Sequence, residues 1–296
     1  KVKELSDLMF ASGSFIAPFI SKVKEELEKL RYIGPLRNIP DRHVAPEAPI
    51  GLSPWPSGKG AWQLLTKLES ESALLTRVNE WLEQQNLLDS GYRVQVKRRY
   101  LIDETVGRIM SGGYRDEDQE LLDQGMPIPP IQPDDVFQVQ IMLEDINRGI
   151  EVDPCDVGVG ISQVIPVVVA ALDREAEIVG IEQPELHLHP KQQAALGDLL
   201  IEGALGSEEE HTKRTLIIET HSEHLILRLL RRIRETSKAA KAPEFALTPD
   251  DLSVLYVSPK DSQSSQVKVM HVDVNGDFVD PWPDDFFEQD YKERFS

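Results

Sequence analysis

Two short apolar runs that end in polar residues constrain the fold of this chain most. Residues 177–181 (EIVGI) and 214–219 (RTLIIE) have the length and composition of buried strands. Helix-forming stretches lie before, between and after them, at residues 163–173, 191–203 and 223–240. Buried strands that alternate with helices predict an α/β fold, with a parallel sheet and flanking helices.

A glycine-rich turn, DVGVGISQ at residues 156–163, leads into the first of these helices. Gly158 and Gly160 let the backbone approach a ligand closely, and Ser162 adds a hydroxyl group. The helix N-terminus that follows offers free N–H groups and a partial positive charge, which suit a phosphate. A tight turn before a buried helix would have the same sequence pattern, so both interpretations stay open here.

The first strand continues into IVGIEQPELHLHP at residues 178–190. The apolar part ends at Glu182, and a carboxylate at the carboxyl end of a parallel strand suits metal and phosphate chemistry. Glu185, His187 and His189 then alternate along a loop. The two histidines are either structural or a zinc pair, for which the sequence offers no clear third ligand.

The second strand continues into LIIETHSEHL at residues 216–225 and places His221 at the same edge. A neutral imidazole can donate to a γ-phosphate or hold an attacking water. Ser222 is expected to cap the next helix, and His224, inside that helix, is expected to pack. The three segments together supply phosphate donors, a carboxylate for a metal, and a polar group near a γ-phosphate.

The three segments resemble the signature motif, the Walker B strand with its D-loop, and the switch histidine of ABC-type ATPases. They are most similar to AAA-type ATPases related to RecF, SMC and OLD proteins, found in bacterial defence loci. In that group the patterns EQPELHLHP and THSEHLILRL recur, as does an upstream YIGPLR like that at residues 32–37. GDFVDPWPDDFF, at residues 276–287, resembles a small uncharacterised domain appended to some of these ATPases.

The resemblance implies a fold and roles for particular residues. The fold would be the C-terminal lobe of an ABC ATPase with a helical insertion and a small β-rich C-terminal extension. ATP and Mg²⁺ would be the cofactors, with Glu182 supporting the metal through water and His221 sensing the γ-phosphate. The signature residues would contact ATP held by a second subunit: Gly158, Gly160, Ser162 and Gln163. The D-loop at the dimer interface would contain His187, His189 and Pro190.

Gln183 departs from that family pattern, because a typical ABC ATPase has Glu at this position to polarise water. An amide can orient water but is a poor base. Either Glu185 or Glu182 then takes over, or turnover is slow and ATP acts mainly as a dimer clamp. The catalytic candidates are therefore Glu182, Gln183, Glu185 and His221.

A phosphate-binding P-loop, GxxxxGK[ST], is absent from the sequence. The nearest stretch, Gly58-Lys59-Gly60, lacks the hydroxyl residue and follows no predicted strand, so we interpret it as loop. We expect the P-loop to lie N-terminal to residue 1 in the intact protein.

The formal net charge of −19 over 296 residues opposes non-specific binding to nucleic acid. Four arginines of one helix, Arg228, Arg231, Arg232 and Arg234, form either a solvated face or a local phosphate or partner site. Cys155 is the single cysteine, and no apolar run is long enough to cross a membrane, so we expect a cytoplasmic protein.

The expected organisation has three parts. Residues 1–135 form a helical lobe with an insertion. It begins with a helix over 1–31, a short strand within 31–43 and a Pro- and Gly-rich loop at 44–60. A helical stretch over 61–88, in one or two pieces, a strand at 92–102 and a mobile acidic Pro/Gly loop at 103–134 follow. Residues 136–248 form the ATPase lobe, entered by a hairpin at 136–153. Residues 249–296 form the extension, with an antiparallel strand pair and an Asn275-Gly276 turn.

The function expected from the resemblance is an ATP-binding and ATP-hydrolysing subunit, active as a homodimer or higher oligomer. Its nucleotide-driven dimerisation would switch an effector protein in bacterial anti-phage defence. A non-hydrolysing, ATP-clamped assembly scaffold and a RecF- or SMC-like DNA-repair ATPase are the alternatives. A nuclease like that of OLD proteins is not expected, because no buried strand presents the acidic residues of the tail.

Overall fold

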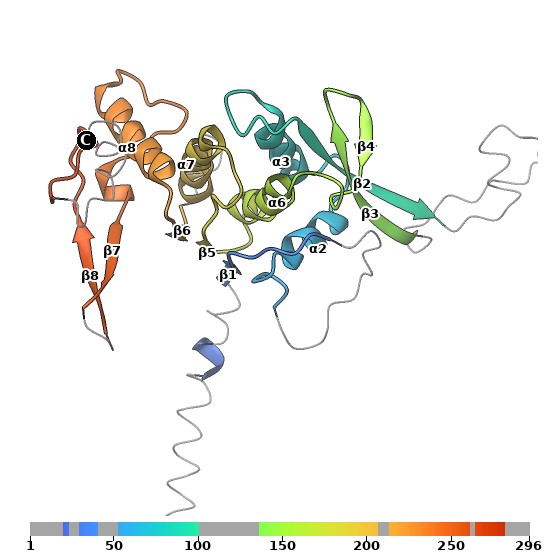
Figure 1. Cartoon of the computed structure of the whole chain (residues 1–296), viewed down its shortest axis with the longest axis horizontal. Coiled ribbons are helices and arrows are strands. Elements are labelled where there is room, and N and C mark those ends of the chain that lie inside the picture. The colour runs from blue at the N-terminus through green and yellow to red at the C-terminus, as the bar shows by residue number, and fades with distance from the viewer. Residues whose placement is uncertain are drawn as a thin grey trace, which may run out of the picture.

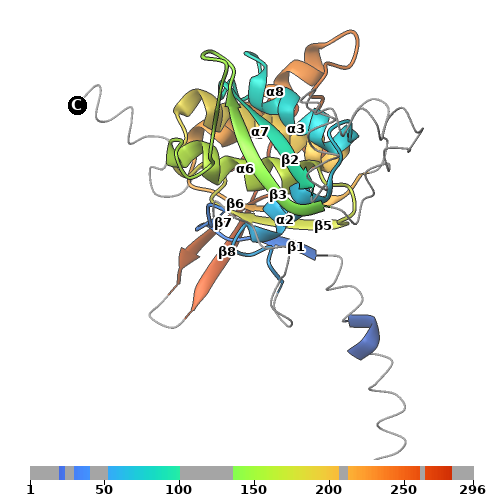
Figure 2. The same ribbon diagram turned by 90° about the vertical axis from the view of Figure 1, so that its right-hand side faces the viewer.

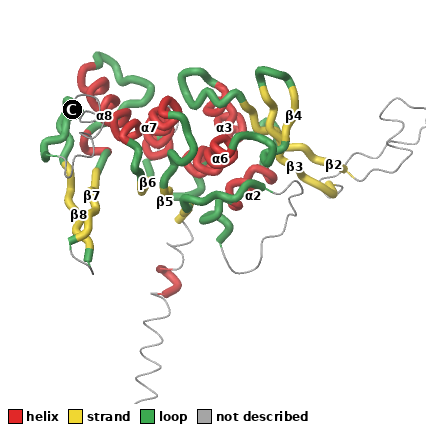
Figure 3. Tube along the Cα trace, viewed as in Figure 1, coloured by secondary structure: helices red, strands yellow, loops and turns green. Residues whose placement is uncertain are grey.

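A computed structural model describes residues 20–23, 30–40, 53–100, 136–206, 213–260 and 264–281. Figure 1 shows these elements from end to end, and Figure 3 shows the helices gathered between two antiparallel groups of strands. In chain order the elements are β1 Leu30–Ile33, α2 Lys59–Lys67, α3 Ala73–Glu83, β2 Tyr92–Tyr100, β3 Val136–Asp145, β4 Ile150–Val152, α6 Val159–Leu172, β5 Ile178–Glu182, α7 Pro190–Leu205, β6 Thr215–Glu219, α8 Glu223–Lys238, β7 Val254–Pro259 and β8 Ser265–Met270.

The central sheet is parallel and has the order β1-β5-β6. The predicted α/β fold is therefore confirmed. The short strand predicted after the first helix is present as β1, which is the third strand of this sheet. The predicted helix over 1–31 is wrong at its end, because Leu30 and Arg31 already pair with β5. Residues 1–19 and 24–29, where the rest of that helix was predicted, lie outside the described residues.

Helices cover one face of this sheet. Ile33, Val179 and Ile181 lie on the covered face and are buried in a core that α2, α3, α6 and α7 share. Figure 2 shows α6 and α7 above the strands. The opposite face is open: Ile217 is 61% exposed, and Leu30 and Ile178 are exposed too.

The helix α6 begins at Val159, earlier than residue 163, so Pro166 lies in its interior rather than in its first turn. The helix tolerates this proline because it is held by packing: every residue from Ser162 to Leu172 is buried. This apolar helix packs against α2, α3 and α7 and against β1 and β5, and its burial positions the glycine-rich turn.

The predicted hairpin at 136–153 is confirmed, and it extends into a second, antiparallel sheet of order β2-β3-β4. The predicted helical stretch 61–88 is two helices, α2 and α3, which pack beside this sheet (Figure 1). The stretch Gly58-Lys59-Gly60 is not loop as predicted, because α2 starts at Lys59 with left-handed Gly58 as its N-cap. The acidic insertion expected at 103–134 lies outside the described residues.

An ion-pair cluster joins α7 to α8. Asp198 of α7 is 1% exposed and receives hydrogen bonds from Arg228 at 2.5 Å and from Arg232 at 2.7 and 2.8 Å. Arg231 binds Glu235 on the exposed side of α8. The guanidinium groups of Arg228 and Arg232 therefore link α8 to α7. These two arginines are neither part of a solvated face nor free to form a phosphate or partner site.

The C-terminal extension contains the predicted antiparallel pair, β7 and β8. The Asn275-Gly276 turn is confirmed as a turn, followed by a single bridge between Val272 and Phe278. Arg234 of α8 donates to the carbonyl of Asn275 at 2.8 Å, which attaches this turn to α8. Within the described part of the chain, no helix is long and apolar enough to cross a membrane.

Candidate functional site

The carboxyl ends of β5 and β6 bring the predicted site residues to one edge of the sheet. Glu182 and Glu219 are direct register partners, and His221 follows two residues after Glu219. His221 is 72% exposed, and its Nε2 lies 3.8 Å from a carboxylate oxygen of Glu219. An exposed imidazole and two carboxylates thus share the edge at which the sequence predicted nucleotide chemistry.

Tyr32 of β1 also reaches this edge. Its hydroxyl donates a hydrogen bond to Glu182 Oε1. This hydrogen bond, together with partial desolvation and the charges of Glu182 and Glu219, raises the pKa of the Tyr32 hydroxyl above its usual value. The bond holds one Glu182 oxygen in a fixed direction. Tyr32 was not among the predicted site residues, although it begins the YIGPLR pattern.

The loop after β5 turns sharply at Gln183, which has a left-handed backbone with φ 43°. The Gln183 N–H donates to the Glu219 carbonyl at 2.8 Å, so the turn remains attached to β6. His187 has a second left-handed backbone, with φ 63°. Residues other than glycine rarely adopt this conformation, so both turns depend on the contacts around them.

Arg37 is the buried cation beneath this loop, with 3% of its surface exposed. Its Nη2 donates to the carbonyl of Glu182 at 2.6 Å and to that of Gln183 at 3.0 Å. Burial lowers the pKa of the Arg37 guanidinium to about 10, and the negative charge of Glu185 opposes that shift. Composition and periodicity did not single out Arg37; its place in the recurring YIGPLR pattern was the available signal.

Glu185 belongs to the loop after β5, but its side chain is buried, with 8% of its surface exposed. Its Oε1 accepts a hydrogen bond from the backbone N–H of His221 at 2.7 Å. Glu185 Oε2 and Arg37 Nε are buried and have no hydrogen-bond partner among the described residues. Glu182 and Gln183 are both more accessible than Glu185, so Glu185 is placed to orient the loops rather than to meet a nucleotide.

The glycine-rich turn presents its backbone rather than its side chains. Gly158 is the exposed N-cap of α6, and a Cβ added there would have no atom within 4 Å. Gly160 packs so tightly that an added Cβ would lie 2.5 Å from the His187 carbonyl oxygen. The buried Ser162 donates to the Pro154 carbonyl at 2.6 Å, and the Gln163 amide pairs with the Arg37 backbone. The polar groups of Ser162 and Gln163 are therefore engaged inside this chain.

The two loop histidines have different surroundings. His189 is the N-cap of α7, where its ring accepts from the Lys191 N–H at 3.2 Å, and Pro190 is the first helical residue. His187 is exposed. The part of the chain that the structure describes contains no group of three His, Cys, Asp or Glu side chains that could hold a metal ion directly, so the zinc pair has no third ligand there.

Ser222 caps α8 as predicted, accepting from the Leu225 N–H at 3.1 Å. His224 is exposed, so the prediction that it packs is wrong. The buried residues of α8 include Leu225, and the next position in a helix is turned by about 100°. His224 therefore faces solvent when Leu225 faces the core.

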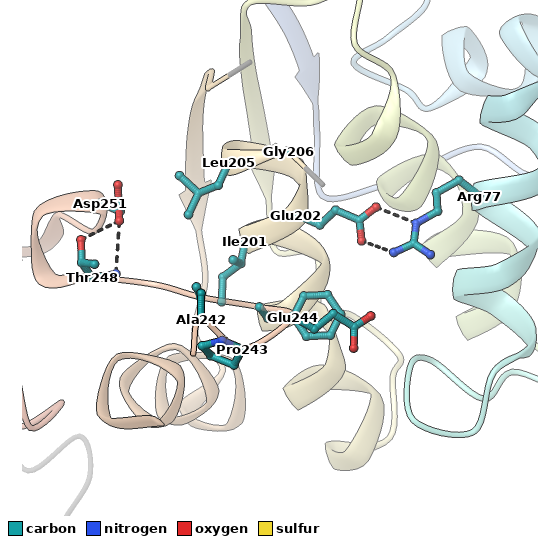
Figure 4. Close-up of a pocket in the computed structure, with 12 residues that line it drawn as sticks. Arg77, Ile201, Glu202, Leu205, Gly206, Ala242, Pro243, Glu244, Thr248 and Asp251 are labelled. Carbon is teal, nitrogen blue, oxygen red and sulfur yellow. Dashed lines mark hydrogen bonds and ion pairs between the residues drawn. The ribbon is translucent and has the colours of Figure 1, made fainter. Parts of the chain in front are cut away.

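A separate hollow of about 490 Å³ lies at the other end of α7 (Figure 4). Three of its charged lining groups already have partners: Arg77 forms two bonds to Glu202, and Asp251 accepts from Thr248 and Lys213. Glu202 is 12 residues after Pro190, which corresponds to about 18 Å along the helix. The hollow is thus remote from the sheet edge and does not enlarge the candidate site.

Two known families match parts of this chain. A family described as "AAA domain, putative AbiEii toxin, Type IV TA system" matches residues 60–228, more than half of the chain. A family described as a protein of unknown function (DUF3696) matches residues 247–294. No curated protein matches the sequence.

Among solved structures, the chain is similar to the Smc head domain with an extended coiled coil bound to the C-terminal domain of ScpA, derived from Pyrococcus furiosus. The identity is 11% and the TM-score 0.38, and the match covers 67% of this chain and 35% of that one. The chain thus spans about a third of the length of that relative. On the extent of the family match, the chain belongs to the AAA-domain ATPases of the putative AbiEii toxin type.

Proposed function

We propose that this chain supplies one half of an ATP-hydrolysing site at the carboxyl edge of β5 and β6. The observation that carries the proposal is the meeting of Glu182, Glu219 and His221 at that edge, in a chain of an ATPase family. Carboxylate oxygens are the ligands that Mg²⁺ prefers, and Mg²⁺ usually keeps several waters. Glu182 would support the metal through water, and it fits this role because one of its oxygens is oriented by Tyr32.

Mg²⁺, when bound, neutralises charge on the phosphates. His221 is exposed beside Glu219, which suits a side chain that donates to a γ-phosphate. Gln183 would orient the attacking water, because an amide both donates and accepts hydrogen bonds. Its backbone is held at both ends of the turn, by Arg37 and by Glu219.

The second half of the site would come from elsewhere. The sequence contains no P-loop, so a segment outside these residues would supply it. The open face of the parallel sheet supports this part of the proposal, since parallel sheets are normally covered on both faces. Ile217 in the middle of β6 is exposed on that face, as is Ile178.

ATP would be shared between two subunits, with the turn at Gly158 reaching the nucleotide of the partner. The exposed backbone of Gly158, at the N-terminus of α6, suits a phosphate better than the side chains of Ser162 and Gln163 do. ATP binding would close the homodimer and hydrolysis would release it, which switches a partner effector. We place this switch in anti-phage defence by analogy with the resembling proteins.

A non-hydrolysing ATP clamp is the second candidate, and Gln183 is the observation that favours it, because an amide cannot act as a general base. A DNA-repair role is less well supported. The net charge is −19, and the four α8 arginines are engaged in ion pairs with Asp198, Glu235 and Asp277.

ATP hydrolysis by the full-length protein tests the proposal, with Glu182→Gln and His221→Ala beside the wild type. Glu151→Gln, an exposed carboxylate of β4, is the matched control. We expect turnover in the wild type and control and its loss in both site variants. A wild type that binds ATP without hydrolysing it would favour the clamp, and a protein that binds no ATP would refute both.

A further inference from the structure

Arg37 lies where the glycine-rich helix, the loop after β5 and the loop after β6 come together. Its backbone is gripped by the Gln163 side chain of α6: Oε1 accepts from the Arg37 N–H at 3.0 Å, and Nε2 donates to the Arg37 carbonyl. Its guanidinium also donates to the Gln163 carbonyl at 3.4 Å. Arg37 is therefore fixed to α6 through both its backbone and its side chain.

The same guanidinium holds the turn after β5. Nη2 donates to two consecutive carbonyls, those of Glu182 and Gln183, at 2.6 and 3.0 Å. Both carbonyls can face one nitrogen because Gln183 is left-handed, with φ 43°. Arg37 thus stabilises the bend from which the Gln183 side chain projects. A lysine ammonium, a compact point charge, cannot reproduce the planar fork that contacts these carbonyls and that of Gln163.

Charge connects Arg37 to the switch-histidine loop. The negative charge of Glu185 raises the pKa of Arg37 against the effect of burial, so the two groups interact electrostatically. Glu185 Oε1 accepts from the His221 N–H at 2.7 Å. The buried Arg37 Nε and Glu185 Oε2 have no hydrogen-bond partner among the described residues. A purely structural tether would leave fewer buried polar atoms unpaired, because each costs stability.

The contacts that link His221 to Arg37 through Glu185 continue through Gln163 to the glycine-rich turn. Gln163 lies five residues after the exposed Gly158, on the same helix. Gly160, between them, approaches the His187 carbonyl so closely that no Cβ would fit. A ligand that displaces the start of α6 therefore displaces Gln163, which is bonded to the Arg37 backbone, and the loop that contains His187.

We infer that Arg37 is a positioning residue that couples the glycine-rich turn of α6 to the Gln183 bend and the His221 loop. The inference rests on the proposed function and deepens it: contact between Gly158 and the nucleotide of a partner subunit would set the geometry of this subunit's own hydrolytic groups. Gln163 takes part through the Arg37 backbone rather than through ATP. Arg37 itself touches no nucleotide.

Arg214 provides a matched control at the opposite end of the sheet. It precedes β6, and its guanidinium donates to main-chain carbonyls, among them those of Gly203 at 2.7 Å and Ala176 at 3.2 Å. Burial and the neighbouring Arg174 charge lower its pKa to about 10, as burial does for Arg37. Arg37→Lys and Arg214→Lys therefore remove similar guanidinium hydrogen bonds to main-chain carbonyls. Arg37 makes them beside the proposed hydrolytic groups, and Arg214 makes them far from those groups.

The test compares both variants in the full-length protein, with nucleotide affinity and kcat measured separately at a temperature where all are folded. We expect Arg37→Lys to bind ATP within about twofold of the wild type and to lose kcat by about 100-fold, since misplacing catalytic groups by about 1 Å has that effect. Arg214→Lys should keep both values. Guanidinium ion should restore part of the activity of Arg37→Ala, whereas equal ionic strength of sodium chloride should not.

Hydrogen exchange gives a second readout that does not need turnover. In Arg37→Lys the amides of Leu186 and His221 should exchange faster than in the wild type, and in Arg214→Lys they should not. If wild type hydrolyses ATP but the two lysine variants keep the same kcat and exchange, the inference is refuted and the proposed function stands. If wild type neither binds nor hydrolyses ATP, the proposed function fails and the coupling role falls with it.

Discussion

Glu185 accepts a hydrogen bond from the backbone N–H of His221 at 2.7 Å, which joins the loop after β5 to the loop after β6. The two residues are 36 positions apart in the chain. The accepting carboxylate of Glu185 is buried, so water cannot easily replace this hydrogen bond. The position of His221 at the sheet edge therefore depends on a residue that the sequence suggested as a catalytic base.

Replacing Glu185 separates its acceptor role from its charge. Glu185→Ala leaves the His221 N–H unpaired, and we expect a loss of about 1–3 kcal/mol in the free energy of unfolding. Glu185→Gln should lose less, because the amide oxygen can still accept this bond. Urea denaturation of both variants measures the difference. Equal losses would show that the charge facing Arg37, rather than the hydrogen bond, is what matters.

The pair of Tyr32 and Glu182 predicts a pH dependence. The hydrogen bond raises the pKa of the Tyr32 hydroxyl, so its folded value lies above its unfolded value of about 10. Stabilisation by this pair is then complete below about pH 10 and is lost as the pH rises through the folded pKa. Tyrosinate absorbance should show one tyrosine that titrates late and that is absent in Tyr32→Phe.

The variant Glu182→Gln identifies the cause of that shift. Its neutral amide removes the charge and weakens the hydrogen bond, so the Tyr32 pKa should fall towards its usual value. A late-titrating tyrosine that persists unchanged in Glu182→Gln would contradict the assignment to this carboxylate.

An added methyl group should lower the stability of the protein at Gly160 but not at Gly158. In Gly160→Ala the new Cβ would lie 2.5 Å from the His187 carbonyl oxygen, so the backbone must shift, at a cost of about 1–3 kcal/mol. In Gly158→Ala the Cβ meets no atom within 4 Å, and the φ of −57° suits alanine. Thermal unfolding of the two variants checks this. A destabilised Gly158→Ala would mean that the turn is packed by something beyond the described residues.

Local sequence pattern was enough to predict β5, β6, α7 and α8, because each is a short periodic segment with clear ends. It could not place β1, whose four residues join the sheet by pairing with β5 almost 150 positions later. The edge position of Glu182 and His221 followed from strand direction alone. Their supports did not, because Tyr32 and Arg37 reach the site from a distant part of the chain.

The signature side chains show a different limit of sequence reasoning. Ser162 and Gln163 have residue types that suit a phosphate, but helix phase turns them into the core. Every residue of α6 from Ser162 to Leu172 is buried, and the uniformly apolar sequence after residue 163 gives no amphipathic pattern from which to predict where these two side chains lie. Gly158 remains exposed because it precedes the helix.

Asp198 provides the strongest stability prediction in the molecule. Its carboxylate is 1% exposed and accepts from Arg228 and Arg232, which are each about one-fifth exposed, at 20% and 18%. Asp198→Asn keeps the shape but leaves Arg228 without its anion and Arg232 with Glu235 alone, and we expect a loss of about 3–5 kcal/mol. Arg231→Ala is the matched control on the same helix, because its pair with Glu235 is largely exposed and contributes about 0.3–0.5 kcal/mol. Urea denaturation of both variants measures the contrast. Losses of similar size would show that α7 and α8 are held by apolar packing alone, with the buried carboxylate contributing no more than a surface charge does.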